Sequence, residues 1–202
     1  NKMKLKVCGL IKEDHVRYCV QNKVEFCGFI LNYKKSHRYI SFNKAKKLTT
    51  VKKNKTKFVG VLVKPTDNEL KRFSNLNLDY FQIYGNFNYF DLAKIKKKFK
   101  KKIISVIQVK KETDINKYKK FEKISDIILW DSTGYEKSLS WNYNWLSSIK
   151  TKPKKMIAGN ITIDKIESLK NIADIIDVSG ALETKKVKDI KKIKTFIQVL
   201  RK

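Results

Sequence analysis

Short apolar runs alternate along the chain with longer segments in which apolar and charged positions are mixed. Eight of these runs are apolar at consecutive positions, a pattern typical of parallel strands that are buried on both faces. We therefore expect strands at Leu5–Cys8, Phe26–Leu31, Phe58–Val63, Tyr80–Ile83, Ile103–Gln108, Ile127–Trp130, Met156–Ala158 and Ile175–Val178.

The segments between these runs have the spacing of amphipathic helices. The clearest begin at Asp91, Thr162 and Lys188, and each repeats apolar residues every three or four positions between lysines. Polar residues that favour a helix N-terminus also occur, such as Asp67 with Glu69 after a proline. Strand and helix thus alternate along the chain.

This alternation predicts βαβ units and a parallel sheet. Eight such units within 202 residues indicate a single (β/α)8 TIM barrel domain over residues 1–202, with short loops. The rival is an open, doubly wound sheet of fewer strands. The first strand is followed by "CGLIKED", which has no GxGxxG dinucleotide fingerprint, so the barrel is favoured.

The net charge of +28 is extreme for a chain of this length. Of the 47 basic residues, only Arg17, Arg38, Arg72 and Arg201 are arginine, whereas nucleic-acid sites usually use arginine to grip phosphate and bases. We therefore expect no nucleic-acid partner. The charge should still attract anionic small molecules to the protein.

The cysteines give no sign of export. Cys8, Cys19 and Cys27 are odd in number and form no CxxC pair, so we expect reduced thiols and a cytoplasmic location. The longest apolar runs, such as "FCGFIL", are far shorter than the ~18 residues of a membrane span, so no membrane partner is expected. No His, Cys or Asp cluster has metal-ligand spacing, and we expect no metal.

Polar residues follow several predicted strands, where the chemistry of a (β/α)8 barrel lies. Cys8 ends the first strand and Asp131 the sixth, so the two side chains are expected to face each other across the barrel mouth. A thiol and a carboxyl group that face one ligand make a general base and general acid pair. Gln82 and Tyr84 lie in "QIYG" at the end of the fourth strand, and Asp177 lies in the eighth.

The last two strand ends fit an anion site. Gly159 and Asn160 follow the seventh strand, and Ser179 and Gly180 follow the eighth. Small residues let backbone N–H groups approach a phosphate, and these two loops are the usual phosphate site of the fold. Arg38, in the loop after the second strand, is expected to close on negative charge from across the mouth.

The chain also resembles a known family, phosphoribosylanthranilate isomerase, in blocks that follow in order over nearly its whole length. The first block, "KVCGL", resembles that family's K-[IV]-C-G-[IL] start, and "SHRYIS" resembles its S-P-R-[YF]-[IV]-[ST]. Further blocks are "FVGVLVKPTDNEL", "LDYFQIYG", "ILWDS" and "MIAGNIT". The last, "IIDVSGALETKKVKDIKKIKTFI", resembles the family's D-[VIL]-S-S-G-V-E region and the helix after it.

The resemblance implies a (β/α)8 enzyme of tryptophan biosynthesis that works without a cofactor on a phosphorylated sugar. Its reaction is an Amadori rearrangement of N-(5'-phosphoribosyl)anthranilate to 1-(o-carboxyphenylamino)-1-deoxyribulose 5-phosphate. Asp131 stands at the family's general-acid position and Cys8 at its general-base position. Arg38 matches the substrate-binding arginine, and Asp177 the aspartate of the last block. The resemblance leaves open whether the protein is a monomer or a homodimer.

The chain departs from the family pattern around the substrate. Tyr84 replaces a histidine, Asn160 replaces a glycine, and "SGAL" replaces S-S-G-V. The glycine-rich segment after the catalytic aspartate has become "YEKSLSWNY", residues Tyr135–Tyr143. Two alternatives therefore stay open. One is a related isomerase that prefers another aminoaldose or sugar phosphate, and the other is a basic binding barrel without catalysis.

Overall fold

Eight parallel strands close into a barrel in the computed structural model, which describes residues 2–135 and 137–202. Neighbouring strands pair in chain order, and β1 closes the ring against β8. The strands are β1 (Lys4–Cys8), β2 (Phe26–Ile30), β3 (Lys57–Val63), β4 (Tyr80–Tyr84), β5 (Lys102–Val109), β6 (Ile127–Ser132), β7 (Lys154–Ile157) and β8 (Ile175–Val178). The predicted barrel is therefore confirmed, and every predicted strand overlaps an observed one.

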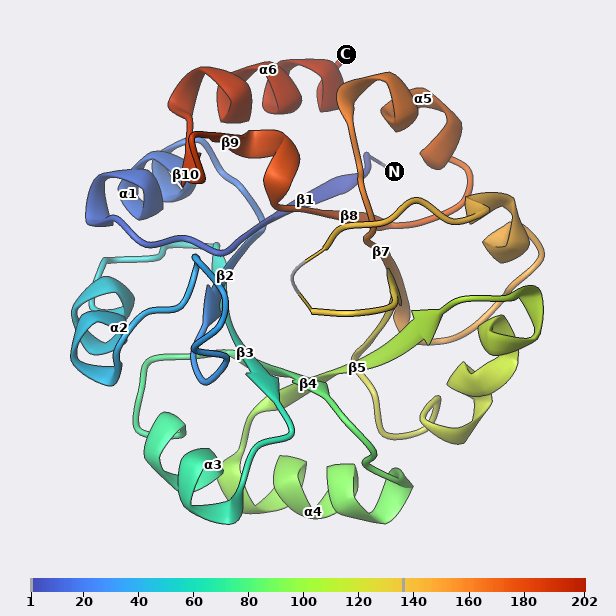
Figure 1. Ribbon diagram of the computed structural model, residues 1–202, viewed down its shortest axis with the longest axis horizontal. Helices are drawn as coiled ribbons and strands as arrows, with labels where there is room; N and C mark the ends of the chain where they lie inside the picture. The colour runs from blue at the N-terminus through green and yellow to red at the C-terminus, as the bar shows by residue number, and fades with distance from the viewer. Residues whose placement is uncertain (1, 136) are drawn as a thin grey trace.

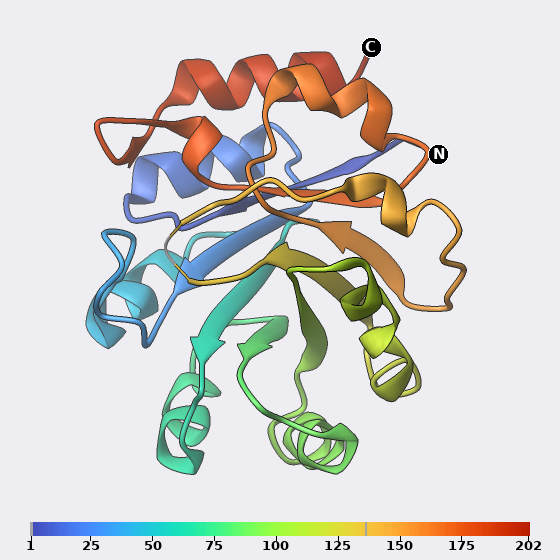
Figure 2. The same ribbon diagram turned by 45° about the vertical axis from the view of Figure 1, so that its right-hand side comes forward.

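Helices form an outer ring around these strands, with α5 and α6 on one side of the barrel and α3 and α4 on the opposite side (Figures 1 and 2). The α-helices are α1 (Glu13–Gln21), α2 (Phe42–Thr49), α3 (Asp67–Phe73), α4 (Tyr89–Phe99), α5 (Ile166–Leu169) and α6 (Ile190–Leu200). Short 3-10 helices are η1 (Glu112–Lys120), η2 (Tyr143–Leu146), η3 (Ile163–Lys165) and η4 (Gly180–Leu182). A two-stranded hairpin, β9 (Glu183–Thr184) with β10 (Val187–Lys188), precedes α6.

Local sequence explains where the regular helices begin. Thr66 caps α3 in a reciprocal capping box with Glu69, and Asp189 caps α6 by accepting from the backbone N–H of Lys191. The segment from Thr162 is a weaker helix than its pattern predicts. It makes one 3-10 turn and then the four residues of α5, and the Thr162 side chain makes no cap bond to the backbone.

Two apolar layers hold the fold together. The larger cluster lies between the strands and the helices, and a smaller cluster fills the barrel with side chains such as Phe26, Val59, Leu129, Met156 and Ile175. Successive strand residues point alternately inward and outward, so a residue two positions after an interior side chain also faces the interior. No helix in the described part of the chain is long and apolar enough to cross a bilayer.

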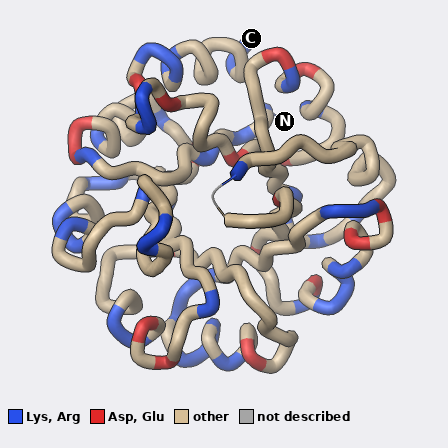
Figure 3. Tube along the Cα trace, in the orientation of Figure 1, with Lys and Arg blue, Asp and Glu red and all other residues tan. Residues whose placement is uncertain are grey.

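Lysine and arginine side chains occur all around the helical ring, with few carboxylates among them (Figure 3).

These like charges repel one another, and dissolved salt screens the repulsion. We therefore expect moderate salt to stabilise the fold. The melting temperature should be higher in about 150 mM NaCl than in about 10 mM NaCl. A sucrose solution of equal osmolality is the control, and a melting temperature that falls as salt is added would contradict the expectation.

Candidate active site

A cavity of about 330 Å³ opens at the carboxyl ends of the strands. Residues 133–135 and 137–142, which lie between β6 and η2, lie over this mouth of the barrel (Figure 1). All ten residues predicted from the sequence line the cavity: Cys8, Arg38, Gln82, Tyr84, Asp131, Gly159, Asn160, Asp177, Ser179 and Gly180. The closed barrel thus brings together strand ends that lie far apart in the sequence.

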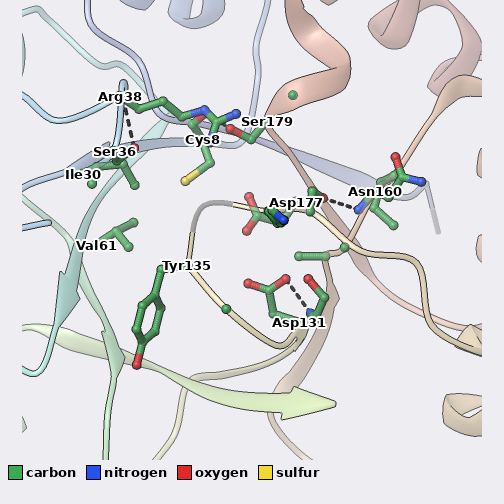
Figure 4. Close-up of a pocket in the computed structure, with 18 of the residues that line it drawn as sticks. Cys8, Ile30, Ser36, Arg38, Val61, Asp131, Tyr135, Asn160, Asp177 and Ser179 are labelled. Carbon is green, nitrogen blue, oxygen red and sulfur yellow. Dashed lines mark hydrogen bonds between the residues drawn. The ribbon is translucent and has the colours of Figure 1, made fainter. Parts of the chain in front are cut away.

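Cys8, Asp131 and Asp177 reach the cavity from β1, β6 and β8. Asp131 stands two positions after Leu129 and Asp177 two after Ile175, and both of those residues pack inside the barrel. The strand period therefore aims all three polar side chains inward. Figure 4 shows them around one common space.

The Asp131 carboxylate is held by two donors. The Tyr84 hydroxyl donates to Oδ2 at 2.7 Å, and the backbone N–H of Ser132 donates to Oδ1 at 2.7 Å. Burial raises the pKa of Asp131 and nearby Asp177 raises it further, while the two hydrogen bonds lower it, and the net pKa is about 6. A carboxyl group with this pKa keeps a useful protonated fraction near neutral pH.

Tyr84 replaces the histidine expected from the resemblance and takes a defined position here. Its hydroxyl receives a hydrogen bond from Gln82 Nε2 at 3.2 Å and donates to Asp131. Burial, and then the charge of Asp131, raise the pKa of Tyr84 well above its usual range, so the phenol remains a donor. Gln82 Oε1 is buried without a hydrogen-bond partner among the described residues.

The Cys8 thiol is almost completely buried at the cavity wall, and burial raises its pKa above the usual value. Lys6 and Lys188 act in the opposite direction, whereas Asp177 adds to the rise. Desolvation of a thiolate outweighs the cations here.

Lys6 is a functional candidate that the sequence analysis missed. It lies opposite Asp177 in the register of β1 and β8, and its ammonium contacts Asp177 Oδ1 at 3.0 Å. Its side chain is completely buried, beside the apolar cluster that fills the barrel. A charged residue between Leu5 and Val7, inside a strand buried on both faces, is the signal that would have revealed it.

Arg38 lies at the cavity wall as predicted, but its guanidinium is oriented by a carboxylate. Nε and Nη2 donate to Glu183 at 2.8 and 2.9 Å, and Lys188 Nζ contacts the same carboxylate at 2.6 Å. Burial alone would raise the pKa of Glu183, but Arg38 and Lys188 lower it to about 2. Glu183, also missed, stands in the last block of the family resemblance.

The chain around Gly159 and Asn160 is tied to the segment after β6. Gly159 has a φ of +109°, and a Cβ there would lie 2.7 Å from the carbonyl oxygen of Leu139. The Asn160 backbone N–H donates to Ser138 Oγ, and Asn160 Nδ2 donates to Ser140 Oγ at 2.8 Å. The backbone donor at this predicted phosphate loop therefore already has a hydroxyl acceptor.

The loop after β8 is fastened to β1. Ser179 Oγ donates to the carbonyl oxygen of Cys8 at 3.0 Å, and Lys188 Nζ donates to both oxygens of Ser179 at 3.3 Å. Gly180 lies exposed beside the Arg38 guanidinium. A cation and exposed backbone thus border this end of the cavity, which suits an anionic group.

Aromatic and branched apolar side chains form another part of the cavity wall. Tyr135 packs edge to face against Tyr33 and Tyr84, with ring centroids 5.4 and 5.7 Å away, and Ile30 and Val61 lie nearby (Figure 4). Such a wall fits a flat aromatic group. Residue 136, which belongs to the rebuilt segment Tyr135–Tyr143, lies outside the described residues.

The arrangement can move protons on an anionic ligand. A carboxyl group with a pKa of about 6 and a thiol line one cavity, which also has cations, backbone donors and an aromatic wall. Among the described residues, no group of three or more His, Cys, Asp or Glu side chains is arranged to hold a metal ion.

Comparison with known proteins agrees with this geometry. Residues 5–199 match the family described as N-(5'phosphoribosyl)anthranilate (PRA) isomerase. The N-(5'-phosphoribosyl)anthranilate isomerase of Streptococcus mutans is 31% identical over 202 residues, which cover 98% of this chain and 99% of that protein.

Solved structures share the fold. Phosphoribosyl anthranilate isomerase from Thermotoga maritima superposes with a TM-score of 0.88 at 23% identity, with 98% of each chain covered. A structure of such an isomerase in complex with reduced 1-(o-carboxyphenylamino)-1-deoxyribulose 5-phosphate superposes with a TM-score of 0.83 at 21% identity, again over 98% of each chain.

Proposed function

Because the chain belongs to the N-(5'-phosphoribosyl)anthranilate isomerase family, and is therefore an isomerase of tryptophan biosynthesis, we propose that its cavity carries out the Amadori rearrangement of N-(5'-phosphoribosyl)anthranilate with Asp131 as general acid and Cys8 as general base. The product is 1-(o-carboxyphenylamino)-1-deoxyribulose 5-phosphate. The reaction is an internal redox change, in which C2' is oxidised and C1' is reduced, so it needs no external electron acceptor.

In this proposal, Asp131 first protonates the ring oxygen of the ribose. The C1'–O bond breaks, and the nitrogen lone pair forms a protonated Schiff base. The Cys8 thiolate then removes the proton from C2', and the electrons of that C–H bond form the C1'=C2' bond of an enolamine. A proton is then added to C1' and the C2' hydroxyl loses its proton, so that the C1'=C2' bond becomes the C2'=O bond of the aminoketose.

The observation that carries the proposal is the shared cavity of Asp131 and Cys8. The acid needs a proton at neutral pH, and a net pKa of about 6 supplies a protonated fraction. The base must reach a carbon-bound proton, and Cys8 lines the cavity from β1 while Asp131 lines it from β6. The two groups approach the ligand from different strands, which suits their action at different atoms.

The two ends of the cavity suit the two ends of the substrate. The Tyr135, Val61 and Ile30 wall would take the anthranilate ring, and Arg38 would take its carboxylate. The loops at Gly159 and Ser179 would take the phosphate. The phosphorylated ligand in the related structure with reduced product analogue supports a sugar phosphate as substrate.

The segment after β6 favours a second candidate, an isomerase of the same chemistry for another aminoaldose phosphate. Ser138 Oγ accepts the Asn160 backbone N–H, so an incoming phosphate must replace this hydroxyl or bind beside it. Tyr135 stands where the resemblance leads us to expect glycine, and its ring narrows the aromatic side of the cavity. Turnover of the two substrate classes distinguishes the candidates.

A turnover assay tests the proposal. Phosphoribosylanthranilate is generated in situ, and the loss of its fluorescence is followed after the protein is added. We expect kcat/KM of about 10⁴ M⁻¹s⁻¹ or more, with competitive inhibition by inorganic phosphate. We expect Cys8→Ser to lower kcat/KM by about 10²- to 10⁴-fold, because a hydroxyl is a far weaker acid than a thiol.

Cys19→Ala is the matched control, since Cys19 lies buried in the cluster between strands and helices and should leave turnover nearly unchanged. Full activity of Cys8→Ser would remove Cys8 from its proposed role. Absence of turnover in the wild type, with turnover of another aminoaldose phosphate, would establish the second candidate instead.

A further inference from the structure

Lys6 places a positive charge inside the barrel, directly below the proposed general base. It precedes Cys8 by two positions on β1, so both side chains face the interior. Its ammonium is completely shielded from solvent and contacts Asp177 Oδ1 at 3.0 Å. An apolar residue could fill this interior position without the desolvation cost of a buried ion pair, so stability alone does not account for the lysine.

Gly28 on β2 brings the ammonium and the thiol close together. A Cβ atom at Gly28 would lie 2.9 Å from Cys8 Sγ and 3.3 Å from Lys6 Nζ. Gly28 is also the register partner of Cys8. The missing side chain therefore leaves a small space that the sulfur and the ammonium both border, and any larger residue would push them away.

The charges around Cys8 come from several elements. Asp177 on β8 is the closest partner of Lys6, while Lys188 on β10 contacts the adjacent Ser179. The other titratable groups around the thiol are Cys27, Tyr84, Asp131 and Arg38. Within this set, Lys6 is the cation that shares the inner face of β1 with the thiol.

We propose that Lys6 is a positioning residue for proton abstraction, whose ammonium, fixed by Asp177 and given room by Gly28, stabilises the Cys8 thiolate. The inference rests on the proposed function in taking Cys8 as the base. The thiolate takes the C2' proton and becomes a thiol, while the C–H electron pair forms the new C1'=C2' bond. Lys6 keeps its proton throughout and acts only through its charge.

The electrostatic balance gives the direction of each change. Burial and Asp177 raise the pKa of the Cys8 thiol, whereas Lys6 lowers it. Removal of the Lys6 charge should therefore raise this pKa further, and removal of the Asp177 charge should lower it. The two substitutions are expected to shift the same group in opposite directions.

The test is the pH dependence of Cys8 alkylation by iodoacetamide, measured without substrate and quantified on the Cys8 peptide by mass spectrometry. Lys6→Met should shift the midpoint upward by about one pH unit or more, so that alkylation below the midpoint becomes about tenfold slower. Asp177→Asn should shift the midpoint downward. Lys4→Met, on the same strand but exposed, is the control and should shift nothing.

A second comparison guards against loss of folding in Lys6→Met, which leaves the Asp177 carboxylate unpaired. The double variant Lys6→Met/Asp177→Asn buries no lone charge, and its midpoint should lie above that of Asp177→Asn alone. An unchanged midpoint in this comparison overturns the inference. Because alkylation needs no turnover, the result is independent of whether phosphoribosylanthranilate is the substrate.

Kinetics supply the complementary readout. In an active enzyme, Lys6→Met should lower kcat/KM between pH 6 and 9 by about the factor by which it lowers the thiolate fraction. The double variant Lys6→Met/Asp177→Asn should likewise have a lower kcat/KM than Asp177→Asn alone. Failure of the wild type to turn over phosphoribosylanthranilate would refute the proposed function, whereas an unshifted alkylation midpoint in an active enzyme would refute only the role of Lys6.

Discussion

Asp131→Asn is expected to lower kcat/KM for phosphoribosylanthranilate by about 10²- to 10⁴-fold while leaving the fold intact. An amide cannot donate the proton that opens the ribose ring. It can still accept the Tyr84 hydroxyl hydrogen bond, so the cavity should keep its shape. Steady-state kinetics and the melting temperature of the same preparation check both parts of this expectation.

The pH profile should identify Asp131 as the acid. Between pH 6 and the thiol pKa, the wild type loses protonated Asp131 as fast as it gains Cys8 thiolate, so kcat/KM should be flat and should fall below about pH 6. In Asp131→Asn only the thiolate fraction varies. The residual kcat/KM should therefore rise about tenfold per pH unit across the range in which the wild type is flat.

The same substitution should stabilise the protein at alkaline pH. Asp131 titrates at about 6 in the folded protein and at 3.8 as a free side chain, so its ionisation weakens the fold as pH rises from about 4 to 6. Ionisation of Asp131 lowers the unfolding free energy of the wild type by at most about 3 kcal/mol, and Asp131→Asn removes this effect. The variant also loses the hydrogen bond from the Ser132 N–H, which offsets about 1 kcal/mol of its gain in stability. The variant should gain stability relative to the wild type between pH 4 and pH 8.

Urea unfolding at these two pH values measures this gain. Glu167→Gln, an exposed carboxylate on α5, is the control and should change neither stability nor kcat/KM. The assignment fails if Asp131→Asn keeps more than about a tenth of the wild-type kcat/KM. It is also contradicted if the residual activity stays flat with pH.

Glu183→Gln should strongly destabilise the protein. Its carboxylate accepts the Arg38 fork at 2.8 and 2.9 Å and the Lys188 ammonium at 2.6 Å. The Lys188 side chain is completely buried, so the amide would leave a buried cation without a counter-charge. We expect a loss of about 3–5 kcal/mol, which corresponds to a fall in melting temperature of roughly 6–20 °C for a chain of this size.

The pH dependence of this loss follows from the pKa of Glu183. Its folded value of about 2 lies below its ordinary value of 4.5, so its stabilising effect is complete above pH 4.5 and disappears as pH falls toward 2. The difference in unfolding free energy between wild type and Glu183→Gln should therefore be smaller at pH 3.5 than at pH 7. Urea unfolding at both pH values gives the two differences.

A compensating substitution separates the charge from the packing. Lys188→Met removes the buried cation, so Glu183→Gln/Lys188→Met should recover part of the stability that Glu183→Gln loses. The double variant should still bind substrate less tightly, because the amide can accept only one of the two hydrogen bonds that Arg38 donates to Glu183. A double variant as unstable as Glu183→Gln would mean that the unpaired Lys188 charge is not the cause.

The chain's own pattern was enough to predict the barrel. Strands buried on both faces are apolar at consecutive positions, and runs such as Phe58–Val63 and Ile127–Trp130 have no other simple interpretation when helices separate them. Helix type was less predictable. The segment Glu112–Lys120 forms a 3-10 helix and the segment from Thr162 yields only a short α5, because packing on the barrel decides how far a weak helix extends.

The position of the candidate site could also be predicted from the sequence, because the carboxyl ends of the parallel strands meet at one mouth of the barrel. Residues such as Cys8, Asp131 and Asp177 could therefore be placed together from their positions at the strand ends. Their ion pairs and pKa values could not be predicted in the same way. The pairs Lys6–Asp177 and Arg38–Glu183 lie 171 and 145 residues apart in the sequence, and only closure of the barrel brings them into contact.

The sequence by itself thus determined the barrel and the end at which its chemistry lies, since both follow from local pattern and chain order. Tertiary structure alone decided which charges are buried together. A pKa depends on the solvent and the charges within a few ångströms, and these are set by side chains from distant strands. The pKa of about 6 at Asp131 and the buried Lys6 beside Cys8 are therefore properties of the folded molecule.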